Sequence, residues 1–159
     1  MWLRTMGVFN LRTITKYVAA VVYAASGIVY LDVGSAGTQK NARNVLGVAF
    51  GPAWAIAICG LLVNNVYYKE LAKRDRTTLL GRRVGDVFGH ALPAAVATAL
   101  GPKALPVSLP TYSLVLLCIY ALALPMLERV YVGVPTWVLW GLAPFTMLAA
   151  TYLRYYPSQ

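Results

Sequence analysis

The sequence VLGVAFGPAWAIAICGLLVNNVYY, residues Val45–Tyr68, decides the fold, because it is 24 residues long and contains no charged side chain. An α-helix rises about 1.5 Å per residue, so a helix of this length is about 36 Å long and exceeds the roughly 30 Å hydrocarbon core of a bilayer. We therefore expect a membrane-spanning helix here. Pro52 lies in its first third, which predicts a kink because proline removes a backbone donor.

A cluster of basic residues follows this apolar stretch directly, and only Glu70 and Asp75 oppose it. Basic residues beside a span stay on the side from which the chain is inserted, so the cluster predicts the orientation of the other spans. The same side chains are predicted to bind anionic lipids such as cardiolipin. They are Lys69, Lys73, Arg74, Arg76, Arg82 and Arg83.

Small residues recur at every fourth position in two segments of the chain. Such ridges let helices approach each other closely in lipid. We therefore predict two helix-packing ridges, formed by Gly47, Gly51 and Ala55 and by Gly81, Gly85 and Gly89. The first ridge is expected to meet Ala20, Ala24 and Ile28 of the preceding helix. The alternative is that a glycine-rich and alanine-rich segment forms such ladders by chance.

The composition indicates a polytopic membrane protein. Of 159 residues, 59% are hydrophobic and 12% are charged, which is about half of the charged share of a soluble domain. We expect an all-α integral membrane protein, a single domain built as a bundle of four or five transmembrane helices with short loops. The expected spans are residues 14–31, 45–68, 84–100, 111–127 and 135–153, and whether 84–100 crosses the bilayer decides between four and five.

The segments between and before these spans have their own signatures. Residues 1–16 contain three basic residues and no acid, which predicts an amphipathic basic N-terminal segment. Residues 32–44 are predicted to form a polar loop, and the prolines of residues 101–110 predict a second one. The net charge of +9 points to anionic lipid rather than nucleic acid, because the basic residues flank spans and form no extended stripe.

Asp86 and His90 form the candidate polar site, because they are four residues apart inside an apolar segment and can meet on one helix face. A carboxylate that orients an imidazole suits a proton relay or a ligand site. The alternative is a structural role, in which Asp86 neutralises a neighbouring arginine. The chain has one histidine, so the sequence predicts no metal site, and it predicts no cofactor other than bound phospholipid.

These features lead to two function hypotheses. The first is a non-catalytic accessory subunit of a large membrane complex, such as a respiratory-chain or ATP synthase complex, that packs against other membrane subunits and binds anionic lipid. The mitochondrial inner membrane is the expected location, with a bacterial or other organellar membrane as the alternative. The second is a small oligomeric transporter or channel in which Asp86, His90 and Asn64 line the path. No catalytic residue is expected, since no nucleophile has a base at a recognisable spacing.

Overall fold

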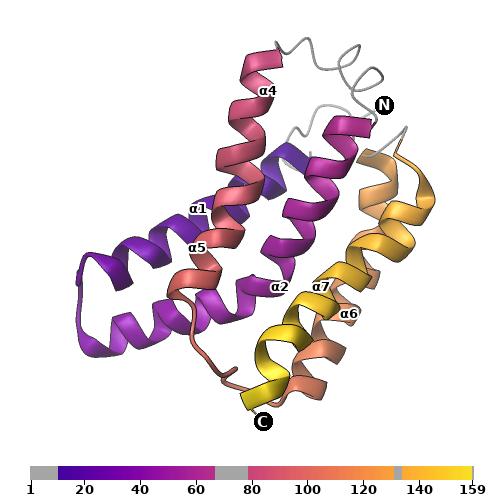
Figure 1. Cartoon of the computed structure of the whole chain (residues 1–159). Coiled ribbons are helices and arrows are strands. Elements are labelled where there is room, and N and C mark those ends of the chain that lie inside the picture. Colours follow the sequence, from indigo (N-terminus) through magenta and orange to yellow (C-terminus); the bar gives the residue numbers. More distant parts are fainter. Residues whose placement is uncertain (1–10, 67–78, 131–133, 159) are drawn as a thin grey trace.

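The computed structural model describes residues 11–66, 79–130 and 134–158, and every regular element within these ranges is helical. The helices are α1 (Leu11–Tyr30), α2 (Ala36–Val66), α4 (Leu79–Gly85), α5 (Leu92–Leu100), α6 (Leu109–Val130) and α7 (Ala143–Tyr155), with the π-helical segments η2 (Asp86–Ala91) and η3 (Val138–Leu142) and the 3₁₀ segment η4 (Tyr156–Ser158). Since α4, η2 and α5 are continuous, and η3, α7 and η4 are as well, the described chain forms five helical rods (Figure 1).

The long helix α2 is the element against which the other rods pack. It contacts α1, η2, α5 and α7. Figure 1 shows that α2 is bent, and Pro52 is the proline inside it, which accounts for the bend predicted from the sequence. The bend gives α2 two arms, and α1 runs alongside the first of them. Val22 and Ala25 of α1 pack there against Ala42 and Leu46 of α2.

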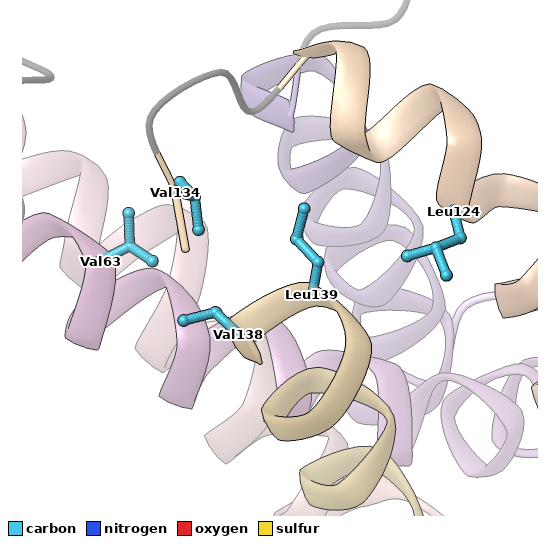
Figure 2. Packing of buried hydrophobic residues seen from close by; sticks show 5 residues of the cluster. All are labelled: Val63, Leu124, Val134, Val138 and Leu139. Carbon is cyan, nitrogen blue, oxygen red and sulfur yellow. The ribbon is translucent and has the colours of Figure 1, made fainter. Parts of the chain in front are cut away.

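The far arm of α2 meets the C-terminal rods through a second apolar cluster. Figure 2 shows Val63 of α2 beside Val138 of η3, with Leu139 turned toward Leu124 of α6 and Val134 above them. All five side chains are buried. This cluster joins the end of α2 to α6 and η3, so the C-terminal rods are attached to the same helix that holds α1 and α5.

Two of the helices are long and apolar enough to cross a membrane, as judged by length and composition, namely Ala36–Val66 and Leu109–Arg129. Most of the apolar side chains of α6 point away from the rest of the protein, including Leu114, Ile119 and Leu122. The expectation of an all-helical chain is confirmed. The expected count of four or five spans stays a prediction, since the described residues contain two candidate spans.

The prediction of a polar loop over residues 32–44 is wrong in its extent, because α2 begins at Ala36. Ser35 is the reason: its Oγ accepts a hydrogen bond from the Thr38 backbone N–H at 3.3 Å, which caps the helix. The connection from α1 is correspondingly tight. Asp32 and Gly34 adopt positive φ angles of 55° and 106°, a conformation that glycine and, less readily, aspartate tolerate.

The loop over residues 101–110 is nearly as predicted. Helix α6 begins at Leu109, so it includes the last two residues of the predicted loop. Ser108 Oγ accepts from the Thr111 backbone N–H at 3.4 Å, which repeats the cap seen at Ser35. Pro110 lies in the first turn of α6, where a missing N–H costs nothing. Pro125 does not end the helix, which continues to Val130.

The C-terminal rod is held to this loop and to α2 by Arg154. Its Nη2 donates to the carbonyls of Gly101 and Pro102 at 3.1 and 3.2 Å, and its guanidinium carbon lies 4.6 Å from the centre of the Phe50 ring. Tyr155 is buried beside it, in edge-to-face contact with Phe50. Arg154 therefore fixes the C-terminal rod through cation–π and backbone contacts.

The first small-residue ridge is a packing surface, but its neighbour is α7 rather than α1. A Cβ placed on Gly51 would collide with Thr151 Oγ1 and would lie 2.9 Å from the Met147 carbonyl oxygen. The expected contact with Ala20 and Ala24 is wrong, because both are exposed. The helix α1 buries Val22 and Ala25 instead, since larger side chains fill its contact with the first arm of α2.

The second ridge has different surroundings at Gly85 and at Gly89. Gly81 and Gly85 are exposed, and a Cβ on Gly85 would meet none of the described residues within 4 Å. A Cβ on Gly89 would lie 3.3 Å from Thr15 Cγ2 of α1. The reason is that η2 turns its polar face toward α2, which leaves Gly85 on the outside.

At Pro52, Pro93 and Pro144, which interrupt helical hydrogen bonding, a tyrosine hydroxyl replaces the missing donor. Pro52 cannot donate to the Val48 carbonyl, which accepts from Tyr112 Oη at 2.5 Å. The donor comes from a different helix, α6. The contact therefore satisfies a backbone group and joins two rods through one hydrogen bond.

The two π-helical segments show the same arrangement. In η3 the Ala143 N–H donates to Val138, and Pro144 has no N–H, so the Leu139 carbonyl accepts from Tyr120 Oη at 2.6 Å instead. In η2 the Leu92 N–H donates to Val87 and is followed by Pro93, and the Phe88 carbonyl accepts from the hydroxyl of Tyr23 in α1. Each proline thus adds a tertiary contact rather than only removing a bond.

We expect Tyr112→Phe to lower the free energy of unfolding by about 1 kcal/mol, because the ring is kept while the Val48 carbonyl loses its donor. The measurement is unfolding in mixed detergent micelles. Tyr152→Phe is the matched control, since Tyr152 is exposed and stacks on Tyr156. Equal stabilities of the two variants would contradict the proposed role of the hydroxyl.

We expect Gly51→Leu to destabilise the isolated protein by roughly 1–3 kcal/mol or to prevent folding, because α7 leaves no room for a side chain. Gly85→Leu introduces the same side chain where the space is open and should leave the free energy of unfolding within about 0.5 kcal/mol of the wild-type value. Thermal unfolding in detergent compares the two. A larger effect at Gly85 than at Gly51 would contradict the packing described above.

Candidate functional site

The candidate site is a group of polar side chains at the interface between η2 and the second arm of α2. Its centre is Asp86, the first residue of the π-helical segment, whose side chain is 5% exposed. Single π-helical turns occur often at functional sites, because the extra residue re-aims a side chain. A buried carboxylate is costly unless donors or cations surround it, so its neighbours determine what it can do.

Two donors converge on one oxygen of this carboxylate. Asn64 of α2 donates from Nδ2 to Asp86 Oδ1 at 2.5 Å, and His90 Nδ1 lies 3.2 Å from the same Oδ1. The structure thus brings together Asp86, His90 and Asn64, the three residues that the sequence analysis selected. The spacing of four residues explains the contact between Asp86 and His90.

The second carboxylate oxygen has a different environment. Asp86 Oδ2 is buried and accepts no hydrogen bond from the described residues, and Nη1 of the Arg83 guanidinium is 3.9 Å away. The same Nη1 donates to Asn65 Oδ1 of α2 at 2.8 Å. Arg83 therefore neutralises Asp86 in part, as the structural reading of the sequence expects, and also ties α4 to α2.

His90 lies against a glycine that the sequence analysis did not select. A Cβ on Gly60 of α2 would lie 2.6 Å from His90 Cδ2 and 2.8 Å from His90 Nε2. No real Cβ approaches so closely, so only glycine leaves room for the imidazole. The sequence signal was present, since Gly60 lies four residues before Asn64, but pairing it with His90 requires knowledge of how α2 and η2 pack.

A further buried polar group comes from α1. Thr15 is 5% exposed and its hydroxyl has no hydrogen-bond partner, while its methyl group lies close to Gly89 in the same η2 segment. Three rods therefore meet around η2: α1 contributes Thr15, α2 contributes Asn64 and Gly60, and η2 contributes the ionisable pair. Thr15 was not selected from the sequence, because a lone threonine in an amphipathic stretch carries no signal.

The arrangement suits proton exchange and does not suit metal binding. Within the described residues, no group of three or more His, Cys, Asp or Glu side chains could hold a metal ion. Cys59 is half-buried beside Thr146, and Cys118 is exposed on α6. Asp86 and His90 are the side chains of this site that can gain or lose a proton.

The predicted lipid-binding cluster lies largely outside the described residues. This applies to Lys69, Lys73, Arg74 and Arg76, and the side chain of Arg82 is not described either. Arg83 is described, and its side chain is 60% exposed while it contacts Asp86 and Asn65. The N-terminal segment 1–16 is described from residue 11 onward, where it forms the beginning of α1.

No family model, no curated protein and no solved structure matches this chain.

We expect Gly60→Ala to displace the His90 ring and to destabilise the protein by roughly 1–3 kcal/mol, because the added methyl group would overlap the imidazole. Gly27→Ala is the matched control, since the same change in α1 meets nothing within 4 Å. There alanine should be neutral or stabilising by about 0.5–1 kcal/mol. Thermal unfolding of both variants measures the difference, and a Gly60 variant as stable as the control would contradict the close contact.

Proposed function

We propose that this protein is a non-catalytic accessory subunit of a large membrane complex, which packs against other subunits and binds anionic lipid. The observation that carries the proposal is the open glycine position at Gly85. The chain contains two ridges of small residues, and its own α7 fills the one on α2. A Cβ at Gly85 would meet none of the described residues within 4 Å, and this open position suits a helix of another subunit.

The outer surface of α6 and α7 supports the same proposal. Large apolar side chains are exposed along both helices, among them Leu122 and Leu153, each 82% exposed, and Phe145. In a bilayer this surface would contact lipid chains or other helices. The acid-free basic start of the chain is typical of mitochondrial import, so we place the complex in an energy-transducing inner membrane. The basic residues after Val66 would bind its anionic lipids.

The second candidate function is a small oligomeric transporter or channel. One observation favours it: Asn64, Asp86 and His90 lie in a single hydrogen-bonded group between helices. Ionisable side chains inside helical membrane proteins often mark a substrate or ion path. In this case the protein would work as an oligomer of its own chain.

Purification from its native membrane in mild detergent distinguishes the two functions. The accessory role predicts a particle that contains many other subunits, identified by mass spectrometry. Gly85→Leu should reduce the amount of this chain in the particle at least about threefold while the isolated variant stays folded, because the new side chain occupies the space for the partner helix.

Gly141→Leu is the control for assembly, since Gly141 is also exposed with nothing within 4 Å among the described residues but belongs to no ridge of small residues. It should assemble like wild type. A particle that contains copies of this chain and no other subunit would contradict the accessory role and support the transporter. Incorporation of the Gly85→Leu variant at the wild-type level would contradict the proposal that a partner helix packs at Gly85.

A further inference from the structure

The hydrogen bonds around Asp86 determine which nitrogen of His90 carries a proton when the ring is neutral. An ionised carboxylate has acceptors only. Asp86 Oδ1 already accepts from Asn64, and His90 Nδ1 lies 3.2 Å from the same oxygen. The contact is favourable when Nδ1 carries the hydrogen and donates it to Oδ1. The lone pair of the neutral imidazole is then on Nε2.

Gly60 sets the surroundings of that nitrogen. The Cδ2–Nε2 edge of the ring faces the backbone of α2 at Gly60, where a Cβ would lie 2.8 Å from Nε2. The His90 side chain is 12% exposed, which is enough for water to reach part of it. The imidazole is thus held from one side by Asp86 and fitted against α2 on the other.

The charges around Asp86 and His90 determine whether this pair can bind a metal cation or a proton. Arg83 lies 3.9 Å from Asp86 Oδ2 and is permanently positive, so a metal cation would be repelled and would find too few ligands. The other neighbours among the described residues are uncharged. Asn64 and Gly60 of α2 lie against the pair itself, while Thr15 and the hydroxyl of Tyr23 of α1 lie against the η2 segment at Gly89 and at the Phe88 carbonyl. A proton needs one acceptor only, and Nε2 provides it.

We propose that Asp86 and His90 form a proton-binding site in which His90 Nε2 takes up one proton from water and returns it, while Asp86 holds the ring through Nδ1–H. Uptake adds the proton to the Nε2 lone pair and gives an imidazolium that Asp86 stabilises. Release restores the neutral Nδ1–H tautomer. This inference goes beyond the accessory role, and it holds whether or not other subunits bind.

Proton uptake at this site would affect the contact between η2 and α2. The ionisable pair belongs to η2, while Asn64 and Gly60 belong to α2, so the added charge acts across the interface between two rods. Asn65 and Arg83 form a second link across the same interface. Proton uptake therefore changes the electrostatics at the contact that holds α4 and η2 on α2.

The single histidine makes the test direct, because every imidazole signal of the chain comes from His90. The full-length protein, labelled with ¹⁵N-histidine and reconstituted in lipid nanodiscs, is followed by NMR from about pH 4 to pH 9. We expect one titration within this range. Above its midpoint Nδ1 should stay protonated and Nε2 should not. These two results need no variant, so a misfolded mutant cannot hide the answer.

Two charge-matched variants test the part played by Asp86. Asp86→Asn should lower the titration midpoint by about one pH unit or more, because the imidazolium loses the neighbouring negative charge. Glu128→Gln removes one negative charge from a residue that is hydrogen-bonded to Trp140 instead, and it should leave the midpoint within about 0.2 pH units of wild type.

Three results would overturn the proposal. They are a His90 that does not titrate between about pH 4 and pH 9, a neutral form with the proton on Nε2, and a midpoint that moves equally in Asp86→Asn and Glu128→Gln.

Discussion

The hydrogen bonds from tyrosine hydroxyls to carbonyls freed by proline are the interaction on which the rest of this structure depends. A helix broken by proline in an apolar environment has a carbonyl that water cannot reach, and such a group costs free energy until a donor is found. Tyr112, Tyr120 and Tyr23 supply the donor at Pro52, Pro144 and Pro93. Each comes from another helix, so the need to satisfy the backbone also determines which rods lie together.

The candidate site is a product of the same constraint. Pro93 and the π-helical turn before it free the Phe88 carbonyl, and Tyr23 of α1 binds there. That contact holds η2 between α1 and α2 with Asp86 and His90 turned toward Asn64. A regular α-helix would place one residue fewer in this turn, and the face that carries Asp86 would be rotated relative to Pro93. The polar site and the proline are therefore parts of one local geometry.

The sequence predicts those features that depend on local spacing and misses those that depend on helix packing. The bend of α2 and the contact between Asp86 and His90 follow from one proline and from a four-residue spacing. The start of α2 was placed too late, because the capping role of Ser35 outweighs the polar composition of residues 36–44. The ridge at Gly85 and the fit of Gly60 against His90 depend on which face of η2 meets α2. Residue types alone do not contain that information.

Gly85 and Asp86 are neighbours in sequence but face opposite sides of one short segment. The proposed partner-helix contact and the proposed proton site therefore lie on opposite sides of that segment. Gly85 is open to the outside, whereas Asp86 is buried against α2. A partner helix at Gly85 would press on the segment from one side, and the charge of His90 acts on its contact with α2 from the other. Because closely packed helices transmit strain rather than absorb it, a subunit bound at Gly85 and a proton bound at His90 would each change the free energy of binding of the other. The open glycine and the buried carboxylate thus lie side by side on one backbone segment.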